Sequence, residues 1–261
     1  MESTGSMNIL RTIVERLSRG KIIKRRITVS GKSFPIFISP DAQLKYLKFG
    51  SGVFDQDLID IAETYLIDDS NVWDVGANVG VFTFAASAVA QKGTVVSIEA
   101  DIWLANILRK TAMLKEYSNN NVCVLPVAIS NENSVASFMV AARGRASNAL
   151  ELAGEGSQMG GVREKQYVPT LTLDTLLDNF SAPDFVKIDV EGAELMVVQG
   201  APRLINEVRP QFYIEVGSDV SSQILNIFLS ANYILFNPQG KRLIDTCTLN
   251  TFFIPEEKCK S

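Results

Sequence analysis

From residue 71 onwards, short apolar runs alternate with stretches whose apolar residues recur every three or four positions. The apolar runs predict strands over residues 72–75, 94–99, 122–127, 185–189, 212–216, 233–236 and 251–254. The periodic stretches predict helices over residues 81–90, 104–117, 173–180, 195–205 and 221–229. Strands that alternate with helices are typical of a mainly parallel sheet with helices on both faces. The pattern therefore predicts an α/β, doubly wound fold.

The first part of the chain has a different pattern. An apolar stripe over residues 7–17 predicts a short amphipathic helix, and alternation around Ser30-Gly31-Lys32 predicts a β-hairpin over residues 21–39. Residues 57–66 predict a helix. Further along, residues 135–140 predict an extra strand, and residues 141–166, rich in Gly, Ala, Ser, Arg and Glu, predict a long mobile loop.

Charge divides the chain near residue 50. Residues 1–50 hold ten Lys or Arg and three Asp or Glu, a net charge of +7, whereas the whole chain carries −4. We therefore expect two parts, an N-terminal helix and hairpin cap over residues 1–50 and a catalytic domain over residues 51–261. A basic segment can bind RNA, a membrane surface or a phosphorylated substrate, or it can pack against an acidic domain. No aromatic run interleaves the cations, so no nucleic-acid partner is expected.

Composition excludes several kinds of enzyme. The 261 residues include no histidine, which rules out Ser-His-Asp and Cys-His nucleophile pairs and histidine-ligated zinc or haem sites. The three cysteines form no CxxC pair, as expected of a reduced, cytoplasmic protein. The longest nearly apolar stretch, residues 81–90, is too short for a membrane span.

The sequence Asp74-Val-Gly-Ala-Asn-Val-Gly80 joins the first predicted strand of the sheet to a helix. In a doubly wound sheet this turn binds a nucleotide-like ligand. Gly76 permits a tight turn, and Gly80 permits close packing of helix against strand. The middle position is Asn78, where a dinucleotide site needs glycine for its pyrophosphate. The loop therefore suits a ligand without phosphates, such as S-adenosylmethionine.

Two acidic residues fit that cofactor. Asp74 ends its strand and can receive the ammonium group of the methionyl part. Glu99 ends the next strand, where an acidic residue hydrogen-bonds the ribose hydroxyls. Further candidates for contact with the cofactor are Phe54, Asp55, Thr83, Ala100 and Ala128.

Three segments together resemble the FkbM-type methyltransferases. They are the glycine loop, Leu173-Asp-Thr-Leu-Leu177, and Phe185-Val-Lys-Ile-Asp-Val-Glu-Gly-Ala-Glu194. The resemblance implies a class I enzyme that depends on S-adenosylmethionine, with a seven-stranded sheet whose last strand is antiparallel. It also implies methyl transfer to a hydroxyl of a sugar, polyketide or other small metabolite, as in natural product biosynthesis. Relatives often carry a histidine soon after the position of Glu215, and this chain has none.

The candidate catalytic residues are the carboxylates Asp189, Glu191 and Glu215, which end or follow two predicted strands. They can take a proton from the acceptor, or two of them can hold a Mg²⁺ ion that acidifies it. In the predicted loop, Ser147 and Asn148, with Arg143 and Arg145 nearby, are candidates for contact with a small or glycosylated acceptor. Two other functions compete with methyl transfer: an NAD-dependent oxidoreductase and a binding protein that keeps the fold without catalysis.

Overall fold

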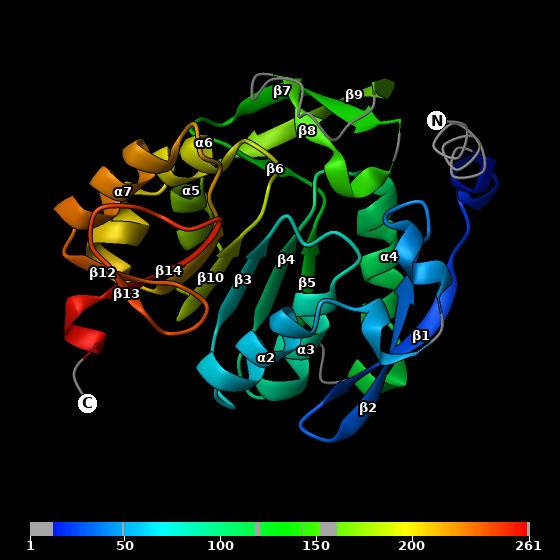
Figure 1. Cartoon of the computed structure of the whole chain (residues 1–261), viewed down its shortest axis with the longest axis horizontal. Coiled ribbons are helices and arrows are strands. Elements are labelled where there is room, and N and C mark those ends of the chain that lie inside the picture. Colours follow the sequence, from blue (N-terminus) through cyan, green and yellow to red (C-terminus); the bar gives the residue numbers. More distant parts are fainter. Residues whose placement is uncertain (1–12, 49, 118–120, 143, 152–160, 260–261) are drawn as a thin grey trace, which may run out of the picture.

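The computed structural model describes residues 13–48, 50–117, 121–142, 144–151 and 161–259. Within these residues the largest sheet has eight strands (Figure 1). In spatial order they are β5 (Val122–Leu125), β4 (Val95–Ile98), β3 (Val72–Val75), β10 (Phe185–Ile188), β11 (Gln211–Glu215), β14 (Asn250–Pro255), β12 (Tyr233–Phe236) and β13 (Arg242–Leu243). The first five run parallel, whereas β14 is antiparallel to both of its neighbours.

The chain enters this sheet in its middle, at β3, and adds β4 and β5 on one side before it crosses to β10 on the other. The strand order therefore reverses between β3 and β10, and open α/β sheets bind ligands at the carboxyl ends of strands at such a point. The predicted α/β, doubly wound class is confirmed. The sheet also contains β13, which was not expected, since a two-residue strand leaves no alternating pattern in the sequence.

The inner strands are buried on both faces, and this is why they could be predicted. Every residue of β3, β4 and β10 is buried. Val72 and Phe185 belong to the apolar cluster on one face of the sheet, and Trp73 and Val186 to the cluster on the other. Continuous apolar runs are what a parallel sheet between two layers of helices requires.

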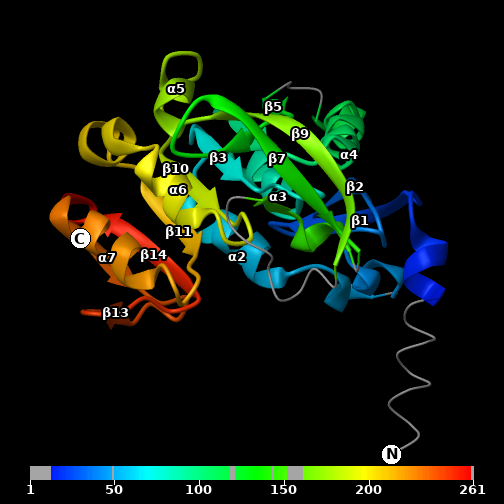
Figure 2. The ribbon, with the colours of Figure 1, turned by 90° about the horizontal axis from the view of Figure 1, so that it is seen from above.

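Each face of the sheet is covered by helices from a different part of the chain (Figure 2). On one face lie α2 (Gln56–Tyr65), α3 (Val81–Val89) and α4 (Ile102–Ala112); on the other lie α5 (Leu173–Leu177), α6 (Glu194–Gln199) and α7 (Ser221–Ser230). Three predicted helices are shorter than expected. One of them, α5, ends at Leu177, and a separate turn follows each of the other two. The first, α4, is followed by a separate 3₁₀ turn, η3 (Lys115–Tyr117). The second, α6, ends before Gly200 and Pro202, and a π-helical turn, η6 (Leu204–Val208), follows.

A second sheet covers the carboxyl ends of the central strands (Figure 1). Its strands, in spatial order, are β6 (Ala128–Ile129), β9 (Val162–Leu171), β7 (Ser134–Ala141) and β8 (Ala149–Leu150). The prediction of a loop throughout residues 141–166 is therefore wrong. The strand β9 escaped notice because most of its first six residues are exposed and charged or polar, so they show no apolar alternation.

The N-terminal hairpin packs on the α3 and α4 side of the central sheet. Its strands are β1 (Ile23–Val29) and β2 (Lys32–Ile38), joined at Ser30-Gly31 as expected. Ile27 and Ile36 are buried in the same apolar cluster as Phe84 and Leu104. Of the helix predicted over residues 7–17, residues 13–17 are helical and the rest lie outside the described residues. Short 3₁₀ turns, η1 (Leu44–Leu47) and η2 (Ser51–Val53), lead into α2, and two more, η4 (Arg145–Ser147) and η7 (Glu256–Lys258), follow later.

Candidate functional site

The turn between β3 and α3 leaves no room for a side chain at its glycines. Gly76 has a φ of +77°, and a Cβ atom there would lie 1.8 Å from the carbonyl oxygen of Asp189. Gly80 has a φ of +89°, and its Cβ would lie 2.5 Å from Cδ2 of Leu108 on α4. Asn78 also has a positive φ, 53°, which Asn adopts more readily than most residues. The glycine pattern therefore reflects close packing of the turn against the backbone of Asp189, just after β10, and against the side chain of Leu108 on α4.

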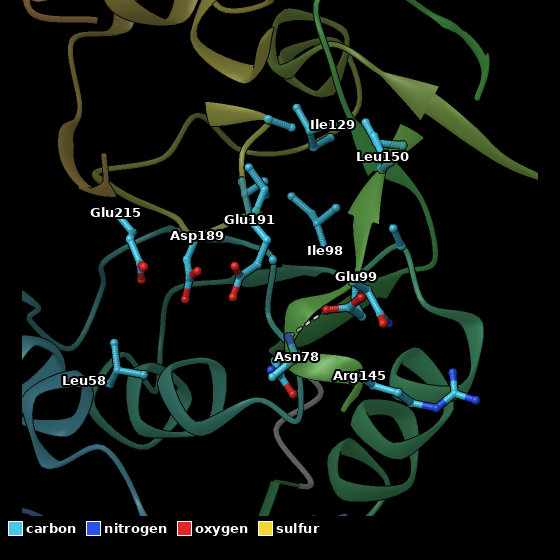
Figure 3. A pocket seen from close by; sticks show the side chains of 18 of the residues that line it. Leu58, Asn78, Ile98, Glu99, Ile129, Arg145, Leu150, Asp189, Glu191 and Glu215 are labelled. Carbon is cyan, nitrogen blue, oxygen red and sulfur yellow. Dashed lines mark hydrogen bonds between the residues drawn. The ribbon is translucent and has the colours of Figure 1, made fainter. Parts of the chain in front are cut away.

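Glu99 follows β4 and is held by two backbone N–H groups. Its Oε2 accepts a hydrogen bond from the Asn78 N–H at 2.7 Å, drawn dashed in Figure 3, and its Oε1 accepts one from the Asp101 N–H at 2.8 Å. Burial raises the pKa of Glu99 to about 7, although both N–H donors lower it. Because each carboxylate oxygen has a second lone pair, Glu99 can still accept hydrogen bonds from a ligand.

Asp74 is completely buried beneath this turn. Its Oδ2 accepts a hydrogen bond from Oγ1 of Thr83 at 2.6 Å, and its Oδ1 lies 3.2 Å from Nζ of Lys187 on the neighbouring strand β10. Lys187 also lies 3.4 Å from Oδ2 of Asp189. Burial alone would lower the pKa of Lys187, but the two carboxylates raise it above its ordinary value. The ammonium group thus joins Asp74 and Asp189 in one network.

A cavity of about 370 Å³ opens at the carboxyl ends of β3, β4, β10 and β11 (Figure 3). The predicted site residues that line it are Asp55, Gly76, Asn78, Glu99, Ala100, Ala128, Asp189, Glu191 and Glu215. Four others do not: Phe54, Asp74, Gly80 and Thr83. Phe54 packs instead against Tyr46, with ring centroids 6.0 Å apart, and Thr83 is fully buried against Asp74.

One end of the cavity, beside Asn78, Glu99 and Arg145, has a group of apolar side chains in its walls; we call it the apolar end. Its walls come from Ile98, Val127, Ile129, Phe138 and Leu150, and Figure 3 shows three of these side chains grouped together. Phe138 and Leu150 belong to the second sheet, so that sheet completes the cavity. This wall could not be predicted, because Leu150 lies within the segment expected to be a loop.

The other end carries the three predicted catalytic carboxylates; we call it the acidic end. Figure 3 shows Asp189, Glu191 and Glu215 next to one another. Burial, followed by repulsion from Asp189, Glu215 and Glu194, raises the pKa of Glu191 to about 7. Burial and repulsion from Asp189 and Glu194 also raise the pKa of Glu215 to about 7. Two groups with such pKa values can accept or release a proton near neutral pH.

Other residues at the acidic end were not predicted. Asp57, Leu58 and Asn250 line the cavity there, together with Gln43 and Lys45 from the N-terminal part. Gln43 and Lys45 were not predicted, because the N-terminal part has no catalytic motif to indicate which of its residues reach the cavity. Tyr213 also lines the cavity; burial raises its pKa to about 12, so that its hydroxyl remains protonated at neutral pH.

The segment that contains η4 forms a further wall. Arg145 and Asn148 line the cavity, whereas Ser147 does not, and Arg143 lies outside the described residues. Asn148 is held at both ends of its amide: its Oδ1 accepts from the Ala141 N–H at 2.8 Å, and its Nδ2 donates to Oδ2 of Asp101 at 2.8 Å.

The hypothesis of a Mg²⁺ ion gains no support. In the part of the chain that the structure describes, no group of three or more Asp, Glu or Cys side chains is arranged to hold a metal ion. None of the helices within the described ranges is both long and apolar enough to span a membrane.

Comparison with known proteins gives a family. Residues 74–235, more than half of the chain, match the model of the methyltransferase FkbM domain. Among solved structures, the chain is 20% identical to a methyltransferase FkbM from Methylobacillus flagellatus KT, with a TM-score of 0.44. That match covers 80% of this chain and 47% of the other, so the chain spans about half the length of that relative. No curated protein matches the sequence.

Two further solved structures share less sequence identity with this chain. The 16S rRNA N2 G1207 methyltransferase of T. thermophilus is 12% identical, with a TM-score of 0.46, and the match covers 90% of this chain and 50% of that one. A SAM-dependent O-methyltransferase of Thermotoga maritima is 12% identical, with a TM-score of 0.40 and coverage of 88% and 76%. Likenesses this distant give no information about the acceptor.

Proposed function

The chain belongs to the FkbM family of S-adenosylmethionine-dependent methyltransferases, and from this premise we propose that it transfers a methyl group from S-adenosylmethionine to a hydroxyl of a small metabolite. One observation carries the proposal. A single cavity, at the point where the strand order reverses, has the Gly76–Asn78 turn and Glu99 at one end and three carboxylates at the other. Cofactor and acceptor can therefore occupy the two ends of one space.

The residues present fit S-adenosylmethionine. Asn78 lines the cavity, and its Oδ1 is buried without a hydrogen-bond partner among the described residues, so a ligand donor can use it. Glu99 has free lone pairs for the ribose hydroxyls, and the apolar walls suit the adenine ring. Asp74 is a weaker candidate than the sequence suggested, because Thr83 and Lys187 already contact its carboxylate. We propose that Asp74 and Thr83 instead hold Lys187, and through it Asp189.

When bound, S-adenosylmethionine supplies a methyl group on a sulfonium sulfur, and the protein must align the acceptor oxygen with it. We propose that Glu215 takes the proton of the acceptor hydroxyl, because it is half-buried and its pKa is raised to about 7. Asp189, paired with Lys187, orients the acceptor. Glu191 adds its charge to the acidic end.

The charge of the acidic end indicates which acceptors fit. Its cation Lys45 is paired with Asp55 at 2.6 Å, and Glu191 and Glu215 have no ion-pair partner among the described residues. Bringing an anionic acceptor into this field is unfavourable. We therefore propose a neutral or cationic small molecule, such as a sugar or polyketide, rather than a phosphorylated compound or nucleic acid. This acceptor, like O-methylation itself, is a proposal.

We further propose that residues 1–50 act as a cap on the catalytic domain, since Ile27 and Ile36 share its apolar cluster. A cytoplasmic location fits the cysteines, all three of which are free. The NAD-dependent alternative is disfavoured by Asn78, whose side chain stands where a pyrophosphate needs glycine.

The test is methyl transfer from S-adenosylmethionine labelled in its methyl group, with small molecules extracted from the source organism, followed by mass spectrometry. We expect a labelled product with a new methyl ether on a neutral or cationic compound. Tight binding of S-adenosylhomocysteine without any labelled product would favour the non-catalytic alternative. Tight binding of NAD, with none of S-adenosylhomocysteine, would overturn the proposal.

A further inference from the structure

Arg145 lies between carboxylates from two distant parts of the chain. Its Nε is 3.2 Å from Oδ2 of Asp41, in the N-terminal part, and its Nη1 donates to Oδ2 of Asp101, at the start of α4. The side chain of Arg145 is 10% exposed, that of Asp41 5% and that of Asp101 0%. The guanidinium also lies over the ring of Trp103, 4.8 Å from its centroid. This is a buried ionic cluster on the wall of the cavity.

Asp101 connects this cluster to Glu99. Its backbone N–H donates to Oε1 of Glu99 at 2.8 Å, while its own Oδ1 accepts the N–H of Trp103 at 2.8 Å and caps α4. Within the described residues, Arg145 is the cation paired with Asp101. A shift of Asp101 would therefore move one of the two donors that fix the Glu99 carboxylate.

Backbone hydrogen bonds join the same segment to the N-terminal part. The N–H of Arg145 donates to the carbonyl oxygen of Asp41 at 2.8 Å, and that of Ala146 to Ala42 at 3.3 Å. Residues on both sides of this contact, Gln43 and Ala146 among them, line the cavity. The N-terminal part thus contributes directly to the wall.

We propose that Arg145 is a positioning residue of the cofactor site: through Asp101 it holds Glu99 in the orientation that binds the ribose, and through Asp41 it fastens the N-terminal part to the cavity. The inference rests on the proposed function, since it assumes that Glu99 binds the cofactor. A buried ion pair that loses one partner leaves an uncompensated charge. Without Arg145, that charge is on Asp101, next to Glu99.

Arg163 provides a matched control. It is 16% exposed and also pairs with Asp41, at 2.9 Å, but the structure gives it no contact with Asp101. Arg145→Met and Arg163→Met therefore both remove a cation that is paired with Asp41. Only Arg145→Met also removes the cation that is paired with Asp101. Isothermal titration calorimetry with S-adenosylhomocysteine measures the affinity of each.

We expect Arg145→Met to weaken binding about tenfold, or ~1.4 kcal/mol, and Arg163→Met to remain within about twofold of the wild type. The KM for S-adenosylmethionine should rise with little change in kcat at saturating cofactor, because the acidic end is untouched. The double variant Arg145→Met/Asp101→Asn should bind more tightly than Arg145→Met alone, since it leaves no unpaired charge, and Asn still caps α4. Because the two residues are in direct contact, their losses are coupled in any case. A purely structural role would lower the free energy of unfolding and leave the affinity of each folded variant unchanged.

Equal affinities for Arg145→Met and Arg163→Met would overturn the inference. If Arg145→Met does not fold, Asp101→Asn and Arg145→Lys make the same test. Each should weaken the binding of S-adenosylhomocysteine. An unchanged affinity in either variant would contradict the proposed role of Arg145. A wild-type protein that fails to bind S-adenosylhomocysteine would instead contradict the proposed function.

Discussion

The two ends of the cavity differ in whether their charged side chains have fixed hydrogen-bond or ion-pair partners. At the apolar end, each oxygen of Glu99 accepts a backbone N–H, and Arg145 is paired with two carboxylates. At the acidic end, Asp189 is paired with Lys187, but the carboxylates of Glu191 and Glu215 have no hydrogen bond or ion pair within the described residues, and burial raises their pKa values to about 7. Groups with fixed partners are suited to hold a ligand in one orientation. Groups without partners are suited to exchange a proton or to meet the charge of a substrate.

The largest effect is expected at Gly76, which lies against the backbone of Asp189. Gly76→Ala would place a Cβ atom 1.8 Å from the Asp189 carbonyl oxygen, at a φ of +77°. We expect it to lower the free energy of unfolding by roughly 3 kcal/mol or more, measured by urea denaturation. Gly31→Ala is the control, since Gly31 has a similar φ of +73° with nothing within 4 Å, and should cost about 1 kcal/mol. Equal losses would mean that the contact with Asp189 is unimportant.

The next effect separates the two ends in catalysis. Glu215→Gln should lower kcat about 100-fold while the affinity for S-adenosylhomocysteine stays within about twofold. Asp189→Asn should likewise keep affinity and lose most turnover. Steady-state kinetics and calorimetry on the same preparations make the comparison. A kcat unchanged in Glu215→Gln would remove this residue from the mechanism.

The pH dependence of turnover follows from the same carboxylate. A base must be ionised, so kcat at saturating cofactor should rise with pH, with an apparent pKa near the value of about 7 for Glu215. Glu215→Gln should abolish this rise. A wild-type profile that is flat between about pH 5.5 and 8 would contradict the assignment of the proton acceptor.

The free energy of unfolding should fall as the pH rises, whereas turnover should increase. Because the pKa values of Glu191 and Glu215 are raised from 4.5 to about 7, the folded chain keeps protons in this window that the unfolded chain has lost. Stability contributed by these groups is therefore greatest below pH 4.5 and falls as the pH rises to about 7. Thermal melts of Glu191→Gln beside the wild type should show a smaller fall. An unchanged fall would show that the pKa of Glu191 is not raised in the folded chain.

The smallest effect is expected at Lys45. Its pair with Asp55 is 29% and 51% exposed, and exposed ion pairs contribute little. Lys45→Gln should change the free energy of unfolding by less than about 1 kcal/mol in urea denaturation. A larger loss would mean that the acidic end depends on this cation for its integrity.

The sequence predicted those strands that are buried on both faces of the central sheet. The strands β3, β4 and β10 are mostly apolar and buried on both faces, and Glu99 followed from its spacing after the glycine turn. The positions of Asp74 and Lys187 could not be predicted in the same way. Period-two alternation paired Lys187 with Asp189, but its contact with Asp74 depends on the register between β10 and β3. The second sheet was predicted only in part. The strand expected over residues 135–140 is β7, whereas β9 was not predicted because its exposed residues carry no period.

The central claim is that the two ends have different tasks, and calorimetric titration of S-adenosylhomocysteine into Glu99→Gln and Glu215→Gln tests it most directly. In Glu99→Gln an amide NH₂ would replace one of the oxygens that accept the N–H groups of Asn78 and Asp101. We predict that this variant binds at least about tenfold more weakly than the wild type, while Glu215→Gln binds as the wild type does. Loss of binding in Glu215→Gln, with full affinity kept in Glu99→Gln, would contradict the account.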